Sequence, residues 1–99
     1  MAKDKSRYRI EAVWKAGQVL NAVADAKEPI GPSEIARESG VSVDTAFRMC
    51  ATLEELGFLQ QIGDRYQLGM GLALFWARKK ASLEGEKSRV ERDLDSLEV

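Results

Sequence analysis

The side chains best suited to recognition chemistry lie between residues 42 and 52. Asp44 and Arg48 are four residues apart in a segment with helical spacing, which places both on the face opposite its apolar residues. An arginine there can donate two hydrogen bonds to guanine O6 and N7, and an aspartate can accept one from cytosine N4. Phe47 beside them can contact a thymine methyl group. Side chains on this face could therefore contact base edges if the helix lies in the major groove of DNA.

A simpler interpretation of the same residues stays open at this point. Asp44 and Arg48 can pair along the helix surface, an interaction of about 0.3–0.5 kcal/mol. Phe47 can cover an apolar seam instead of a base. Phosphates would repel Glu54 and Glu55, so we expect the N-terminal half of this helix to enter a groove.

Hydroxyl and basic side chains nearby are candidates for the phosphate backbone. Arg65 lies in an expected hairpin, and residues 1–8 form a basic arm that can follow the backbone or the minor groove. The complete set of candidate DNA-binding residues is Ser33, Ser42, Val43, Asp44, Thr45, Phe47, Arg48, Thr52, Arg65, Lys3, Lys5, Arg7 and Arg9.

Composition excludes several other classes of protein. The 99 residues carry 15 basic and 16 acidic side chains, no histidine and one cysteine, Cys50. This excludes a disulfide framework, and we expect no metal site. No pair of nucleophile and base is visible, and Gly69-Met70-Gly71 lacks the third glycine of a dinucleotide-binding loop. We therefore expect neither an enzyme nor a bound cofactor.

The chain has no segment typical of export or membrane insertion. The first ten residues, MAKDKSRYRI, are charged and unlike a signal peptide. The apolar run GMGLALFWA is much shorter than the roughly 20 residues that cross a bilayer. We expect a cytoplasmic protein without membrane contact, associated with the nucleoid if it binds DNA.

Residues that start and stop helices predict the order of the elements. Pro29 ends the first helix, Gly31 and Pro32 begin a second, Gly40 ends it, and Ser42 caps a third. The expected helices span 9–25, 32–39, 43–56 and 72–83, and the expected strands span 58–62 and 65–68 around a turn at Gly63-Asp64.

The apolar side chains follow helical spacing in both long helices. In the first helix they form one stripe: Ile10, Val13, Trp14, Gly17, Leu20, Val23 and Ala24. In the third helix they form the expected core face: Ala46, Met49, Cys50, Leu53 and Leu56. Ile35 and Ala36 form the buried side of the second helix. A helix-turn-helix followed by a hairpin is a mainly α winged helix-turn-helix, that is, a three-helix bundle with a two-stranded wing.

These segments resemble the DNA-binding domain of the isocitrate-lyase-regulator (IclR) family. The resemblance rests on KAGQVLNAVADAKEPIGPSEIARESGVSVDTAFRMCATLEELGFL and on YQLG after the hairpin, and covers residues 13–76. It implies a winged helix-turn-helix that binds double-stranded DNA and regulates transcription. Family members usually continue into a larger effector-binding domain, and we expect this chain to be a stand-alone domain without it. Val43 and Asp44 replace the basic residue and serine that commonly open the family's recognition helix.

The remaining segments suggest how two copies associate. We divide the chain into the arm at 1–8, a winged helix-turn-helix domain at 9–77 and a charged C-terminal helix at 78–99. Trp76, Leu83, Val90 and Leu97 are seven apart, as in the d positions of a heptad, with Ala73, Lys80, Lys87 and Leu94 at a. We expect a homodimer through the N-terminal helix, the C-terminal helix or both, although an ordinary solvated helix explains the same charges.

One rival function also stays open. The winged helix can be a protein–protein interaction module without DNA binding, in which Val43, Phe47 and Ala51 form an apolar patch. The acidic body of the chain favours this alternative, because residues 16–77 hold four basic and eight acidic side chains.

Overall fold

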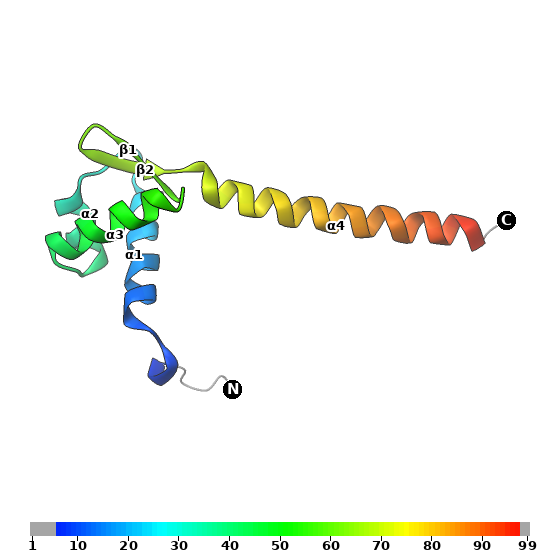
Figure 1. Cartoon of the computed structure of the whole chain (residues 1–99), viewed down its shortest axis with the longest axis horizontal. Coiled ribbons are helices and arrows are strands. Elements are labelled where there is room, and N and C mark those ends of the chain that lie inside the picture. Colours follow the sequence, from blue (N-terminus) through cyan, green and yellow to red (C-terminus); the bar gives the residue numbers. More distant parts are fainter. Residues whose placement is uncertain (1–5, 98–99) are drawn as a thin grey trace.

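The computed structural model describes residues 6–97 and has the predicted winged helix-turn-helix fold (Figure 1). A short 3-10 helix, Ser6–Tyr8, precedes the domain. The elements then follow in the order α1 (Glu11–Asp25), α2 (Pro32–Ser39), α3 (Val43–Glu55), β1 (Leu59–Ile62), β2 (Arg65–Leu68) and α4 (Met70–Leu97). Within residues 6–97, no helix combines the length and apolar character needed to cross a membrane.

Local geometry confirms the predicted start and end of α2 and the predicted start of α3. Gly31 is the N-cap of α2 with Pro32 at its first position, and Gly40 ends the helix in the left-handed conformation, with φ of 74°. Ser42 caps α3 by accepting a hydrogen bond from the Thr45 backbone N–H at 3.1 Å. The turn between α2 and α3 is therefore determined by residues that act locally.

The core lies where α1, α2 and α3 meet and where the hairpin closes over them. Ile35, Val19 and Cys50 are its largest fully buried side chains. The complete core is Val19, Ala22, Val23, Ile30, Ile35, Ala36, Ala46, Cys50, Leu53, Leu59 and Tyr66.

The wing is an antiparallel hairpin whose first strand packs on α3 and whose second strand packs on α1. Leu59 pairs with Leu68 and Ile62 with Arg65, and Gly63 takes the positive φ of 64° that the tight turn requires. Ile30, between α1 and α2, exchanges two backbone hydrogen bonds with Tyr66, at 3.0 and 2.8 Å. Because the Tyr66 side chain is also buried, the wing and the three helices share one core.

Only part of the stripe expected on α1 packs on the core. Val23 is buried and Leu20 packs against the core, whereas Ile10, Val13 and Trp14 are exposed. Val19 and Ala22, outside the expected stripe, are also buried. The sequence contains alanines next to the larger side chains, so the apolar arc of α1 is wider than one face. The close approach of α2 and α3 selects the part of this arc that carries small residues.

Several boundaries also differ from the prediction, among them the start of β1, which is Leu59 rather than residue 58. Helix α1 begins at Glu11 rather than residue 9, because Ile10 is the N-cap in an extended conformation. Helix α3 ends at Glu55, and Leu56, expected in the core, is an exposed C-cap. The helix expected over 72–83 and the C-terminal helix form one helix of 28 residues, α4, which continues through Gly85. The proposed boundary at residue 77 therefore falls inside a continuous helix.

Helix α4 is attached to the domain only by its first turns and projects away from it (Figure 1). The Gly71 N–H donates to the Gly57 carbonyl at 2.8 Å, and the Phe58 and Phe75 rings lie 5.6 Å apart. A Cβ atom on Gly71 would lie 2.6 Å from the Gly57 carbonyl oxygen, and one on Gly69 would lie 2.5 Å from it. The glycines of the Gly69-Met70-Gly71 sequence thus allow this close approach of two backbone segments.

Replacing Gly71 with alanine should destabilise the domain by about 1–3 kcal/mol, because the new methyl group overlaps the Gly57 backbone. The matched control is Gly85→Ala in the same helix, where an added Cβ has no neighbour within 4 Å. That control should increase the free energy of unfolding by about 0.5–1 kcal/mol. Urea unfolding followed by tryptophan fluorescence and circular dichroism measures both. Equal effects of the two substitutions would contradict the proposed contact.

The core also predicts a dependence of stability on high pH. Burial raises the pKa of the Cys50 thiol from 9.0 to about 11, because the thiolate loses its hydration. The unfolded chain ionises near the lower value, so the contribution of the neutral thiol is complete below pH 9 and is lost as the pH rises towards 11. Urea titrations should show a smaller loss of stability over this range for Cys50→Ala than for the parent. Identical pH profiles would show that Cys50 does not contribute.

Candidate nucleic-acid interface

The outer face of α3 carries the residues that the sequence singles out for recognition. Its inner face, with Ala46, Cys50 and Leu53, is buried against the other helices. The structure places Asp44 and Arg48 on the opposite, solvent-facing side. The face of α3 predicted to read DNA is therefore open to solvent in the part of the chain that the structure describes.

Arg48 and Asp44 form only a loose ion pair. The Arg48 Nη1 and Asp44 Oδ2 atoms are 4.0 Å apart, and the two side chains are 77% and 82% exposed. Such a pair is screened by solvent and contributes little to stability. The guanidinium group can therefore leave the carboxylate for a stronger partner at small cost.

Val43 and Phe47 make an apolar patch beside this pair. They are 51% and 55% exposed and lie one turn apart on the first half of α3. The patch consists of the two methyl groups of Val43 and the ring of Phe47. Phe47 directly precedes Arg48 in the sequence. It can contact either thymine methyl groups or an apolar protein surface.

The hydroxyl groups at the start of α3 form their own network. The Ser42 hydroxyl donates to Thr45 Oγ1 at 2.9 Å and accepts from the Thr45 N–H. The Ser42 proton is used in this internal bond, and the Thr45 hydroxyl proton remains able to donate to a phosphate oxygen. Ser33 lies exposed in the first turn of α2, where its hydroxyl is also open to a phosphate.

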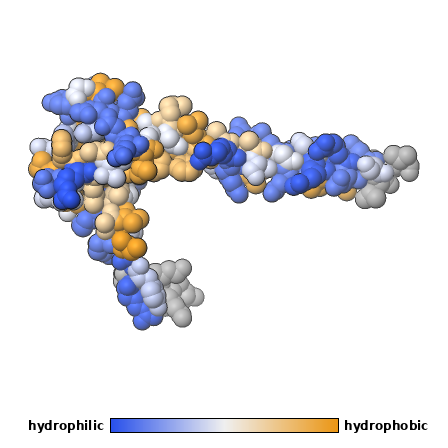
Figure 2. Space-filling model, in the orientation of Figure 1, coloured by the Kyte–Doolittle hydropathy of each residue, from blue (hydrophilic) through white to orange (hydrophobic). Residues whose placement is uncertain are grey.

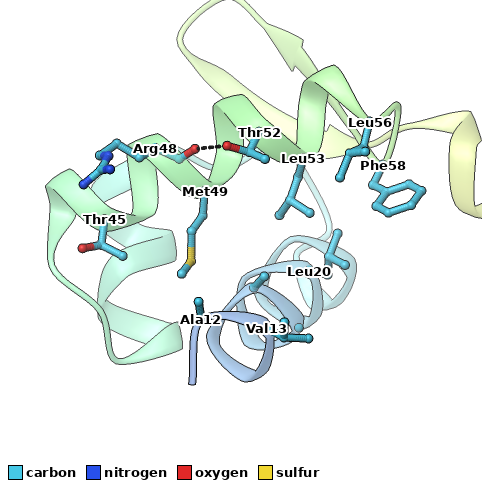
Figure 3. A pocket seen from close by; sticks show the side chains of 12 residues that line it. Ala12, Val13, Leu20, Thr45, Arg48, Met49, Thr52, Leu53, Leu56 and Phe58 are labelled. Carbon is cyan, nitrogen blue, oxygen red and sulfur yellow. Dashed lines mark hydrogen bonds between the residues drawn. The ribbon is translucent and has the colours of Figure 1, made fainter. Parts of the chain in front are cut away.

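Thr52 is less suited to the role expected for it. Its hydroxyl donates to the Arg48 carbonyl at 2.9 Å, so its only proton is already used within the helix (Figure 3). Thr52 also faces a groove of about 660 Å³ between α1 and α3. Apolar side chains such as Val13, Leu20 and Phe58 line this groove together with Arg48 and Thr45.

Arg65 lies at the start of β2, where its contact differs from a free wing-tip cation. Its Nη1 donates to the Pro29 carbonyl at 3.3 Å, although the residue is exposed. The arginine thus bridges the wing and the α1–α2 loop. Its remaining N–H groups can still donate to a phosphate.

The two arginines before α1 that the structure describes lie over aromatic rings. The Arg7 guanidinium lies 4.8 Å from the centre of the Tyr8 ring, and that of Arg9 lies 4.4 Å from the centre of the Trp14 ring. Arg9 also pairs with Glu11 at 3.0 Å. Lys3 and Lys5 lie outside the described residues. Arg9 therefore lies against the first turn of α1 and does not extend away from it.

The structure also brings forward residues that the sequence analysis did not select. Arg37 is exposed one turn after Ser33 on α2, with a loose contact of 3.9 Å to Glu34. Gln61 lies next to the tip of the wing and donates to the Gly63 carbonyl at 3.0 Å. Helical spacing from Ser33 could have identified Arg37, whereas no charge marks Gln61. Within residues 6–97, no cluster of three or more acidic or cysteine side chains could hold a metal ion.

Comparison with known proteins follows the same segments. Residues 12–63 match the model of the IclR helix-turn-helix domain. The structure of an IclR family transcriptional regulator from Brucella abortus is 30% identical over 78% of this chain and 32% of that protein, with a TM-score of 0.64. An IclR transcriptional regulator from Alicyclobacillus acidocaldarius is 32% identical over 73% of this chain and 30% of that protein, with a TM-score of 0.67.

More distant likeness extends to the fold alone. The repressor BlcR from Agrobacterium tumefaciens is 21% identical over 77% of this chain and 30% of that protein, with a TM-score of 0.60. No curated protein matches the chain. The chain spans 30–32% of the length of these regulators.

Proposed function

The chain belongs to the IclR helix-turn-helix family, and on this premise we propose that it is a transcriptional regulator that binds double-stranded DNA sequence-specifically. Helix α3 enters the major groove, with its N-terminal half against the base edges. The observation that carries this proposal is the exposed Arg48, whose guanidinium makes only the loose contact with Asp44.

Base recognition by this face exchanges one weak contact for stronger ones. Arg48 leaves Asp44 and donates two hydrogen bonds to guanine O6 and N7. Asp44 then accepts from a cytosine N4 amino group, while Phe47 and Val43 contact thymine methyl groups. The exposed Asp44–Arg48 pair is worth only about 0.3–0.5 kcal/mol in a helix, whereas a good bidentate base contact discriminates by about 1–3 kcal/mol. The exchange is therefore favourable.

Phosphate contacts orient the helix in the groove. Three groups donate to phosphate oxygens: the remaining O–H of the Ser42–Thr45 pair, the Ser33 hydroxyl and the free N–H groups of Arg65. The arm supplies further cations through Lys3, Lys5 and Arg7, and Arg9 next to the arm contributes less because Trp14 and Glu11 hold its side chain. Thr52 has already donated its only hydroxyl proton to the Arg48 carbonyl, so it can accept a hydrogen bond from a base amino group but does not donate to a phosphate. Such contacts are strongly weakened by salt.

Two copies act together on DNA. One winged helix with few phosphate contacts binds weakly, and the exposed apolar surfaces of α1 and α4 support association as a homodimer. A dimer reads two half-sites separated by one helical turn or a multiple of it. A regulator of this kind works in the cytoplasm, at the nucleoid.

A second function has a specific observation in its favour. Val43 and Phe47 expose apolar surface on the same helix that borders the large apolar groove between α1 and α3. These surfaces together suit a protein–protein interaction module that does not bind DNA. The two functions differ in what they require of Arg48, which only DNA binding needs.

Replacing Arg48 with alanine should weaken binding to a cognate duplex by about 1–3 kcal/mol and relax the preference at one base position. The cognate duplex comes from selection of bound sequences from a random pool, and fluorescence anisotropy measures affinity. The matched control is Arg92→Ala, which removes the same charge from the far half of α4. If both variants bind like the parent, α3 does not read the groove and the protein-interaction module is favoured.

Removal of residues 1–8 should weaken binding about equally for all sequences and make its salt dependence shallower, by about one unit of slope for each phosphate that the arm neutralises. Arg9→Ala in the full chain should change the slope less, because Trp14 and Glu11 already hold that side chain. Anisotropy titrations over a range of salt concentrations give both slopes. A truncated protein with the parent slope would exclude the arm from the interface.

A further inference from the structure

The outer part of α4 exposes an apolar seam that no other part of the described chain covers. Trp76, Leu83 and Val90 are exposed and are separated by two helical turns each. Helix α4 contacts its own domain only near its first turns, and its remaining length stands in solvent (Figures 1 and 2). A seam of this kind is buried when a second helix packs against it.

The lysines within the seam decide how a second copy of α4 can pack. Lys80 and Lys87 occupy the positions that alternate with Trp76, Leu83 and Val90. In a parallel pair, equivalent positions face each other, so Lys80 would face Lys80 and Lys87 would face Lys87. In an antiparallel pair, Lys80 faces Leu83 of the other copy, and Lys87 faces Trp76. The antiparallel arrangement avoids two contacts between like charges and places an ammonium group against an indole ring.

The charges that flank the seam favour the same direction. Lys79 and Glu86 lie on one side of it, and Glu84 and Glu91 lie on the other. An antiparallel pair brings Lys79 of each copy near Glu86 of the other, which makes two attractive contacts. A parallel pair brings Lys79 near Glu84 but also Glu86 near Glu91, so that attraction and repulsion occur together.

We propose that the α4 helices of two copies of this chain pair in antiparallel orientation, with Lys80 of each copy opposite Leu83 of the other. This inference rests on the proposed function in that it specifies how the DNA-binding dimer is held. Each seam then buries Trp76, Leu83 and Val90 against the other copy.

This register sets the distance between the two winged helices. Met70 begins α4 and lies opposite position 93 of the other copy. The two Met70 residues are therefore about 23 residues apart along the pair, or about 35 Å at 1.5 Å per residue. Half-sites on consecutive turns of B-DNA are about 34–36 Å apart. The antiparallel pair thus separates the two points at which the domains join α4 by about the length of one turn of the duplex.

A charge substitution separates the two directions, with the dimer dissociation constant of the full chain measured by analytical ultracentrifugation. Glu86→Lys should weaken the antiparallel dimer about fivefold to tenfold, because two attractive contacts become repulsive. The double variant Lys79→Glu with Glu86→Lys should restore the parent value. The matched control, Asp95→Lys, makes the same change of charge away from the seam and should change the dissociation constant less than about twofold.

The opposite result overturns the proposal. A parallel pair would become tighter in Glu86→Lys, because a contact between Glu86 and Glu91 becomes attractive. A parent chain that remains monomeric at all concentrations overturns it as well. Neither outcome affects DNA contact by a single domain, which the Arg48→Ala comparison tests separately.

A distance measurement supplies the second test, since a charge variant can act through the helix itself. A spin label on Ser96→Cys should show a separation of about 44 Å between copies in the antiparallel pair, against about 20 Å in a parallel one. Cys50 is fully buried, and the parent treated with the same label is the control. A dominant short distance would contradict the antiparallel arrangement.

Discussion

Close packing of small side chains between α3 and the other helices is the constraint on which the rest of this structure depends. Ala46 and Cys50 on α3 are fully buried, and they share one core with Ala22 and Ala36 on the other two helices. Small residues let the helix backbones approach closely, and interiors packed at this density allow few alternative rotations. The rotation of α3 about its axis is thereby determined. Arg48 faces solvent because Ala46 and Cys50 face the core.

The polar residues of the candidate interface differ in how freely they can bind a ligand. Arg48 and Asp44 are held only by their contact at 4.0 Å. Ser42, Thr52 and Arg65 each make a hydrogen bond within the fold. The capping and bridging residues therefore have a structural role at the same positions where they can contact phosphate. Substitution of such a residue would therefore alter the fold as well as the phosphate contact that we propose for it, whereas the Arg48 side chain makes only the loose contact with Asp44.

Helix α4 differs physically from the domain that carries it. Its first turns are tied to the α3–β1 turn by the close approach at Gly71 and by the contact between Phe58 and Phe75. Beyond this anchor the helix has alternating apolar and charged residues that pack on no part of the described domain. Long isolated helices gain most of their stability from packing of an apolar face. In the antiparallel dimer that we propose, the second copy supplies that packing and gives the lysines of the seam a defined role.

The sequence by itself determined the features that depend on neighbours along the chain. The two ends of α2 and the start of α3 are determined by Gly31, Pro32, Gly40 and Ser42, and the hairpin turn is determined by Gly63. Caps and tight turns can be predicted in this way because a few consecutive residues form them. The resemblance to the IclR family likewise identified the fold. Only the tertiary structure decided which part of the broad apolar arc of α1 is buried, that Arg9 lies against Trp14, and why Gly69 and Gly71 are glycines. Those outcomes depend on how closely segments far apart in the chain approach each other, and periodicity along one helix carries no information about that distance.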